Sequence, residues 1–176
     1  MPTTLPVPIE FSLPEGWRPA PLDETAAAGV AFVALRPEPD AGFTANITVA
    51  GDFRPDAATL DDMADESVER LREAAGSVVV AGRREIGTAD APGLAQRLTF
   101  SAVIDGTPRD LVQSHVYLAV LDLADRHQRA VIQLVLTATA DQHDRVLGDF
   151  QDFLRTVRPD TAGTALRSVT PPRKTG

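Results

Sequence analysis

The chain has 176 residues, of which 43% are hydrophobic and 24% are charged, which is the composition of an ordinary globular domain. Its net charge is −8 at neutral pH, and its isoelectric point is near 4.8. A nucleic-acid partner requires a concentrated basic surface, so this balance argues against DNA and RNA as partners. The sequence holds no cysteine, which excludes disulfides, thiol catalysis and sulfur-ligated zinc sites.

Nothing in the sequence has the pattern of a membrane or export segment. The apolar stretches have the length of strands, whereas a bilayer span needs roughly 20 apolar residues. Segment 1–17, MPTTLPVPIEFSLPEGW, contains neither the basic nor the apolar region of a secretory signal. We therefore expect no membrane span and a cytoplasmic location.

The first half of the chain predicts three strands followed by a helix. The strands are expected at 9–13, 29–35 and 43–51, where short apolar runs are bounded by turns rich in proline and glycine. Apolar residues then recur at helical spacing. This helix is expected to begin at Thr59, whose hydroxyl suits the N-cap, and to end at Gly76.

The second half predicts four strands and a terminal helix. The strands are expected at 77–87, 94–104, 110–121 and 128–138, and the few residues between them join antiparallel neighbours. The helix is expected over about 141–157, because apolar residues form one stripe along it. These residues are Val146, Leu147, Phe150, Phe153, Leu154 and Val157.

This order of elements predicts an α+β fold, with an antiparallel β-sheet of about six to seven strands flanked by two long helices. A single domain is expected over residues 9–158, preceded by an N-terminal extension at 1–8. Residues 159–176 have the composition of turns and disordered segments. We therefore expect them to form a flexible C-terminal tail.

Several segments of the chain resemble one bacterial family. They are FSLPEGW near the start, FTANITV before the first helix, IGTADAPGLAQRLTF after it, and the strand that begins with Gln128. Over residues 9–158 the chain resembles the LpqN-like proteins of actinobacteria, within the Mog1/PsbP/DcrB-like (DUF1795-type) group. The resemblance implies a Mog1/PsbP-like α/β/α sandwich that binds without catalysis. Many LpqN-type proteins are exported lipoproteins, and segment 1–17 departs from them because it shows no lipidation signal.

Alternation along the strands sorts their side chains into two faces of the sheet. The apolar face is expected to contain Phe43, Ala45, Ile47, Val49, Leu94, Leu98, Phe100, Ile104, Val112, Val116, Leu118, Val120, Ala130, Ile132, Leu134 and Leu136. The opposite face is expected to collect Thr44, Asn46, Thr48, Arg97, Thr99, Ser101, Gln113, His115, Tyr117, Gln133 and Thr137. This second face is rich in amides and hydroxyls and carries few formal charges.

Two interpretations of the polar face remain open. One is a face left to solvent, which is common for an antiparallel sheet. The other is an adaptable binding surface, because a merely solvated face usually carries Lys and Glu rather than amides, hydroxyls and an imidazole. The expected anchor is Tyr117, whose ring offers apolar area and whose hydroxyl offers a hydrogen bond. The expected binding residues are Asn46, Thr48, Arg97, Thr99, Gln113, His115, Tyr117 and Gln133.

The sequence predicts no catalytic site, no metal site and no cofactor. It contains no G-x-S-x-G, P-loop or G-x-G-x-x-G motif, and no pair among its three histidines has metal-ligand spacing. His127 is expected in a hairpin turn and His143 in an exposed first turn of a helix. His115, which has Gln113 and Tyr117 beside it on its face, is the candidate for a general base.

Three classes of function follow from the polar face. The expected one is a non-enzymatic adaptor or chaperone that binds a protein partner over this face. The resemblance favours it, because some relatives in the wider group are secretion chaperones that hold apolar helices of effector proteins against the sheet. The alternatives are a small-ligand carrier that uses the same face, and a hydrolase-like enzyme centred on His115. A homodimer is a further possible assembly.

Overall fold

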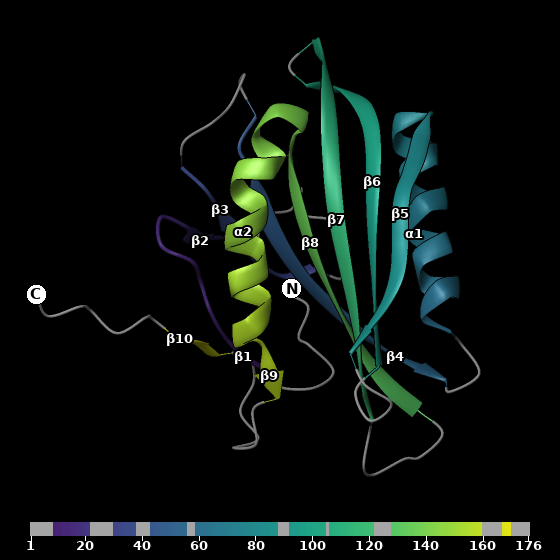
Figure 1. Ribbon diagram of the computed structural model, residues 1–176, viewed down its shortest axis with the longest axis vertical. Coiled ribbons are helices and arrows are strands. Elements are labelled where there is room, and N and C mark those ends of the chain that lie inside the picture. Colours follow the sequence, from purple (N-terminus) through teal and green to yellow (C-terminus); the bar gives the residue numbers. More distant parts are fainter. Residues whose placement is uncertain are drawn as a thin grey trace, which may run out of the picture.

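In the computed structural model, the described residues form two helices and two sheets (Figure 1). It describes residues 9–21, 30–37, 43–55, 59–87, 92–104, 106–121, 128–159 and 167–169. The helices are α1 (Leu60–Ala75) and α2 (Ala140–Thr156). The strands are β1 (Ile9–Ser12), β2 (Arg18–Ala20), β3 (Val30–Leu35), β4 (Asn46–Pro55), β5 (Val78–Gly87), β6 (Pro92–Ile104), β7 (Thr107–Leu121), β8 (Gln128–Thr139), β9 (Arg158–Pro159) and β10 (Arg167–Val169).

The main sheet contains seven strands in the order β2-β3-β4-β8-β7-β6-β5, and each strand is antiparallel to its neighbours. Strand β4, from the first half of the chain, pairs with β8 from the second half and so joins the two halves into one sheet. A smaller sheet has the order β10-β1-β9. The seven-stranded antiparallel sheet and its two long helices confirm the predicted α+β fold.

Helix α1 begins and ends where the sequence predicts. The Thr59 hydroxyl accepts a hydrogen bond of 3.0 Å from the backbone N–H of Asp62, whose carboxylate accepts one of 3.3 Å from the backbone of Thr59. This reciprocal capping box satisfies two backbone donors that the first turn would otherwise leave open. Gly76 ends the helix with φ of 84°, in a region that residues with a Cβ avoid. Helix α2 begins at Ala140, one residue before the predicted start at 141. Its N-cap is Thr139, whose hydroxyl accepts a hydrogen bond from the backbone N–H of Gln142.

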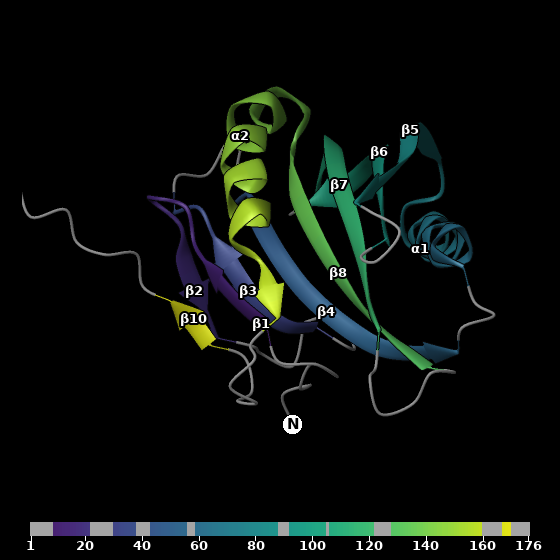
Figure 2. The same cartoon turned by 60° about the horizontal axis from the view of Figure 1, so that its bottom comes forward.

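The two helices cover opposite faces of the main sheet. Figure 2 shows α2 beside β4 and β8, and α1 beyond β5 and β6. Under α2 lies the larger core, which contains Ile9, Phe11, Trp17, Ala34, Ala45, Ile47, Val49, Val116, Ile132, Leu134, Leu136, Ala138, Val146, Phe150 and Phe153. Between α1 and the sheet lies a second core, which contains Met63, Ala64 and Val68 of the helix and Val78, Leu94, Leu98, Phe100, Leu111, Tyr117 and Val131 of the strands. Because both faces of the sheet are covered at its centre, β7 and β8 bury apolar side chains on both sides.

The small sheet attaches the start of the domain to its end. Strand β1 carries two core residues, Ile9 and Phe11, and pairs with β9 on one side and in parallel with β10 on the other. The sequence predicts a flexible tail over 159–176, whereas residues 167–169 of that tail form β10. The residues 1–8, 160–166 and 170–176 lie outside the described part of the chain.

Deletion of residues 162–176 is therefore expected to lower the melting temperature by a few degrees. The deletion removes the register pairs between β10 and β1, and each backbone hydrogen bond contributes about 0.5–1.5 kcal/mol net. One kcal/mol corresponds to about 2–4 °C for a domain of this size. Differential scanning calorimetry measures the effect, and deletion of 170–176 alone is the control, which should leave the transition in place. Equal melting temperatures for the two truncated proteins would show that β10 adds no stability.

Candidate binding cleft

The register of β6 on β7 corrects the predicted division of the sheet. Gln96 lies opposite His115, whereas Arg97 lies opposite Ser114 on the other face. The predicted polar face therefore loses Arg97, Thr99 and Ser101, and it gains Gln96. The same register places Leu94, Leu98 and Phe100 under α1, in the cores that contain Tyr117 and Leu111, and not in the core under α2.

Tyr117 is buried and does not form part of the protein surface. None of its side chain is exposed, because α1 covers it with Met63 and Ala64. The Tyr117 hydroxyl donates a hydrogen bond of 2.7 Å to Oγ of Ser67 on the helix. Burial raises the pKa of this phenol, and its hydrogen bonds with Ser67 and Gln96 oppose the rise. The expectation that Tyr117 anchors a partner at the surface is thus wrong: the ring fixes α1 on the sheet.

Beyond α1, the same face of the sheet forms a cleft of about 420 Å³ between α1 and β3. Its volume lies within the range typical of small-molecule and cofactor sites. Most of the predicted binding residues meet here. The cleft is lined by Asn46, Thr48, Gln113, His115, Gln133 and Thr137 of the sheet, by Ser67, Arg70, Leu71 and Ala74 of α1, and by Val30, Val33, Ala50 and Val135.

His115 lies at the floor of this cleft, with both ring nitrogens at hydrogen-bond distance from a neighbour. Nε2 is 2.8 Å from Oε1 of Gln113, and Nδ1 is 3.1 Å from the Tyr117 hydroxyl. The amide of Gln113 in turn donates to the Thr137 hydroxyl at 3.2 Å. Burial, together with the positive charge of Arg70, lowers the pKa of His115 from 6.5 to about 4. The imidazole is therefore neutral at pH 7.

This environment makes His115 a weak proton acceptor at neutral pH, where a base with a pKa near 7 is most effective. Its neighbours are an amide and a phenol whose own pKa is raised, rather than a carboxylate or a nucleophile. The arrangement holds the side chains of Gln113, His115 and Tyr117 in fixed positions. It suits recognition through hydrogen bonds better than acid–base chemistry.

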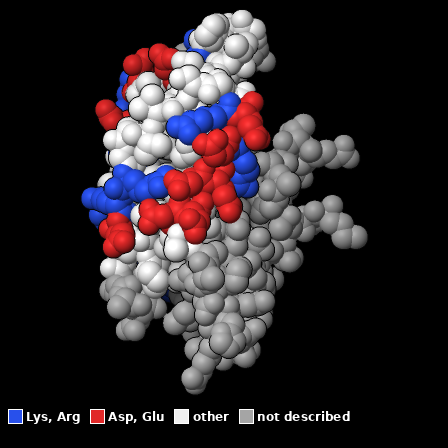
Figure 3. Space-filling view, turned by 90° about the vertical axis from the view of Figure 1, so that its right-hand side faces the viewer, with Lys and Arg blue, Asp and Glu red and all other residues white. Residues whose placement is uncertain are grey.

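The charge of the described cleft lining comes from helix α1. Arg70 is the one charged side chain among the described residues that line the cleft, and its Nη2 lies 3.5 Å from Oγ of Ser67. The outer side of α1 is different. Figure 3 shows acidic and basic groups intermixed there, and they include ion pairs of Arg83 with Asp65 at 2.8 Å and of Arg72 with Glu69 at 2.7 Å. Such exposed pairs belong to a solvated surface, whereas the cleft offers hydrogen-bonding groups to a ligand.

The other histidine that the structure describes is also buried. His143 is 2% exposed, which corrects the expectation of an exposed helix start. Its Nε2 lies 2.8 Å from the Ser114 hydroxyl, a contact that joins α2 to β7. Burial, and then the charge of Arg97, lower the pKa of His143. His127 lies outside the described residues. Thr99, the remaining predicted binding residue, lines a different pocket of about 410 Å³, together with Ser101 and Asp110.

Two further properties concern the described residues alone. They contain no group of three or more His, Asp or Glu side chains placed to hold a metal ion. Neither α1 nor α2 is long and apolar enough to cross a membrane.

The fold, an antiparallel sheet between two helices, is similar to that of Mog1 and PsbP. Solved structures with this fold include LpqN of Mycobacterium tuberculosis, which is involved in cell envelope biogenesis. It has a TM-score of 0.59 and 16% identity over 88% of this chain and 86% of that one. The Saccharomyces cerevisiae Ran-binding protein Mog1p has a TM-score of 0.54 and 15% identity, over 85% of this chain and 89% of its own.

The cyanobacterial PsbP of Synechocystis has a TM-score of 0.52 and 16% identity over 84% of both chains. At such identities the similarity shows the fold alone, because one fold serves many functions. No protein-family model matches the sequence, and no curated protein does.

Proposed function

We propose that this protein is a non-enzymatic adaptor or chaperone that binds a protein partner in the cleft between α1 and β3. The observation that carries the proposal is the lining of the cleft. Amides, hydroxyls and a neutral imidazole stand beside valine and leucine side chains, and Arg70 adds one positive charge. Amide and hydroxyl groups can pair with the backbone and polar side chains of a peptide segment, and the apolar residues can pack against its aliphatic groups.

The arginine in the cleft, Arg70, indicates which charge the partner segment carries. A partner segment that enters the cleft would place a carboxylate at Arg70, because charge-assisted hydrogen bonds to guanidinium are stronger than neutral ones. Mog1p, a Ran-binding protein of the same fold, supports a protein partner by analogy. The proposal also places the chain with the LpqN-like proteins of actinobacteria, on the strength of the segments FSLPEGW and FTANITV and the fold shared with LpqN.

A small-ligand carrier is the second candidate. The volume of about 420 Å³ favours it, because a cleft of this size can hold a compact polar molecule. A carrier would retain a small molecule through purification, which native mass spectrometry detects, whereas an adaptor would retain a protein.

The proposal assigns the protein to the cytoplasm, with the cysteine-free sequence as support, and cell fractionation tests that location.

Replacement of Arg70 by glutamine is expected to weaken partner binding about tenfold or more. The partner is first captured from the native organism with the wild-type protein, and its affinity for each variant is then measured by isothermal titration calorimetry. Loss of a hydrogen bond to a charged group costs about 1.5–3 kcal/mol, which corresponds to about 10- to 100-fold in affinity.

The matched control is Arg72→Gln, which removes the same charge two residues away on the outer side of α1. This variant should bind the partner within about threefold of the wild type. Equal affinities of the Arg70→Gln and Arg72→Gln variants would place the partner elsewhere on the molecule. Capture of no protein at all, together with a bound small molecule, would favour the carrier.

A further inference from the structure

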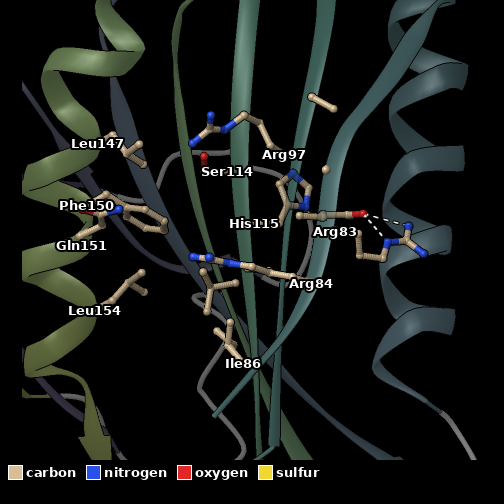
Figure 4. A pocket seen from close by; sticks show the side chains of 15 residues that line it. Arg83, Arg84, Ile86, Arg97, Ser114, His115, Leu147, Phe150, Gln151 and Leu154 are labelled. Carbon is tan, nitrogen blue, oxygen red and sulfur yellow. Dashed lines mark hydrogen bonds between the residues drawn. The ribbon is translucent and has the colours of Figure 1, made fainter.

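A second cavity lies on the opposite face of the sheet, between α2 and strands β5, β6 and β7 (Figure 4). It has a volume of about 530 Å³. Its helix side is mainly apolar, with Gln151 as the polar residue of α2 among those that line it. Leu147, Phe150 and Leu154 of α2 form that side, and Ile86 and Val116 continue it on the strands. The side chains of Leu147, Leu154 and Ile86 are only half buried, so this cavity leaves aliphatic surface accessible that the core does not cover.

Three arginines line the sheet side of the same cavity, namely Arg83, Arg84 and Arg97, and two of them extend into it. Figure 4 shows the side chains of Arg84 and Arg97 extending from the strands toward α2. Within the described part of the chain, neither guanidinium forms a hydrogen bond or an ion pair with another residue, and no Asp or Glu is among the residues that line the cavity. The neighbouring Arg83, by contrast, lies toward α1 and is paired with Asp65 at 2.8 Å and with Gln96.

A bulge in β5 decides which arginine enters the cavity. The register on β6 shifts between Val80 and Gly82, after which Arg83 lies opposite Gln96 and Arg84 lies opposite Ala95. Gln96 belongs to the face under α1, and Ala95 belongs to the cavity. Without the extra residue, the alternation of side chains would place Arg83 in the cavity and Arg84 under α1. The bulge thus gives the cavity an arginine that has no carboxylate partner.

We propose that this second cavity binds an anionic amphiphile, a carboxylate with a linear aliphatic chain, such as a fatty acid. The carboxylate binds between Arg84 and Arg97, and the chain lies along Leu147, Phe150 and Leu154 of α2. Guanidinium groups recognise carboxylates by charge-assisted hydrogen bonds, and the half-buried aliphatic residues gain apolar contact. A neutral lipid would leave both arginines without a counter-charge, and a small inorganic anion would leave the apolar side unused. This site lies on the opposite face of the sheet from the cleft between α1 and β3, and His115 is the residue that borders both. The proposal does not depend on the function proposed for that cleft.

Isothermal titration calorimetry with sodium decanoate, below its micellar concentration, tests the site. Decanoate should bind at one site per chain, and decanol, which has the same chain length without the charge, should bind at least about tenfold more weakly. Each methylene added between octanoate and decanoate should strengthen binding about threefold to fourfold, because burial of a methylene contributes about 0.8 kcal/mol.

The double variant Arg84→Gln/Arg97→Gln should bind decanoate at least about tenfold more weakly than the wild type. Both residues are exposed, so the variant is expected to fold, and its circular dichroism spectrum checks this. The matched control is Arg109→Gln, which removes a charge from β7 at a position that does not line the cavity. Absence of decanoate binding, equal binding of decanol, or equal affinity of the double variant would each overturn the proposal.

Discussion

Replacement of Phe150 by alanine is expected to lower the free energy of unfolding by about 3–5 kcal/mol. The ring is 1% exposed, stacks on Phe153 at a centroid distance of 6.4 Å, and packs α2 against the sheet. Truncation removes the transfer free energy of the ring and leaves a void that the surrounding core fills only in part. Urea titration followed by circular dichroism measures the change.

The control for this prediction is Gln151→Ala, the next residue of the same helix. Its side chain is exposed, so its replacement should change the free energy of unfolding by no more than about 0.5 kcal/mol. A loss below about 1 kcal/mol for Phe150→Ala would show that α2 contributes less to the core than its burial indicates.

The elements of this fold are predictable because their signals are local. Thr59 and Gly76 mark the ends of α1 through side-chain and backbone preferences that act within one turn. The later strands are joined by short links, and such links leave antiparallel neighbours as the favoured arrangement. The strand β10 has no local sequence signal of this kind. Its three residues have a mixed composition, and they form a strand only by pairing with β1, which lies far away in the sequence.

The assignment of side chains to faces was less predictable. Alternation shows that Leu94, Leu98 and Phe100 share a face, but it does not say which helix covers that face. If the sheet had one apolar face, these three side chains would belong to the core under α2. In this structure α1 packs on the other face, and the three side chains form a second core with it. Gln96 was the available signal, because a polar residue at the same spacing between two leucines indicates a face that also carries hydrogen-bonding groups.

The candidate cleft was predicted in part for the same reason. Its floor comes from β4, β7 and β8, whose polar alternation the sequence displays. Its wall comes from α1, where Ser67 lies on the buried side and Arg70 beside the cleft. The outer residues of an amphipathic helix look alike in sequence, and only the position of α1 on the sheet distinguishes Arg70 from Arg72.

Acidification is expected to destabilise the protein through His115. In the unfolded chain this histidine has its ordinary pKa of 6.5, whereas burial and Arg70 lower the pKa in the folded protein to about 4. The unfolded state therefore binds a proton between these values and the folded state does not, so stability falls as the pH decreases from 6.5 to 4. Each pH unit of difference corresponds to about 1.4 kcal/mol, which gives a loss of about 3 kcal/mol over this range.

The variant His115→Gln isolates this contribution, because glutamine can keep a hydrogen bond at the site but does not titrate. The carboxylates, and His143 with its lowered pKa, also make the free energy of unfolding depend on pH. They do so equally in the wild type and in the variant, so their contributions cancel in the difference between the two proteins. Urea titrations at pH 7, 6, 5 and 4 should show the wild type losing about 3 kcal/mol more than the variant. Parallel curves would mean that His115 takes up a proton as readily in the folded protein as in the unfolded chain. With the lowered pKa, the imidazole at the floor of the cleft stays neutral throughout the physiological range, and Arg70 is the one charged side chain among the described residues that line the cleft.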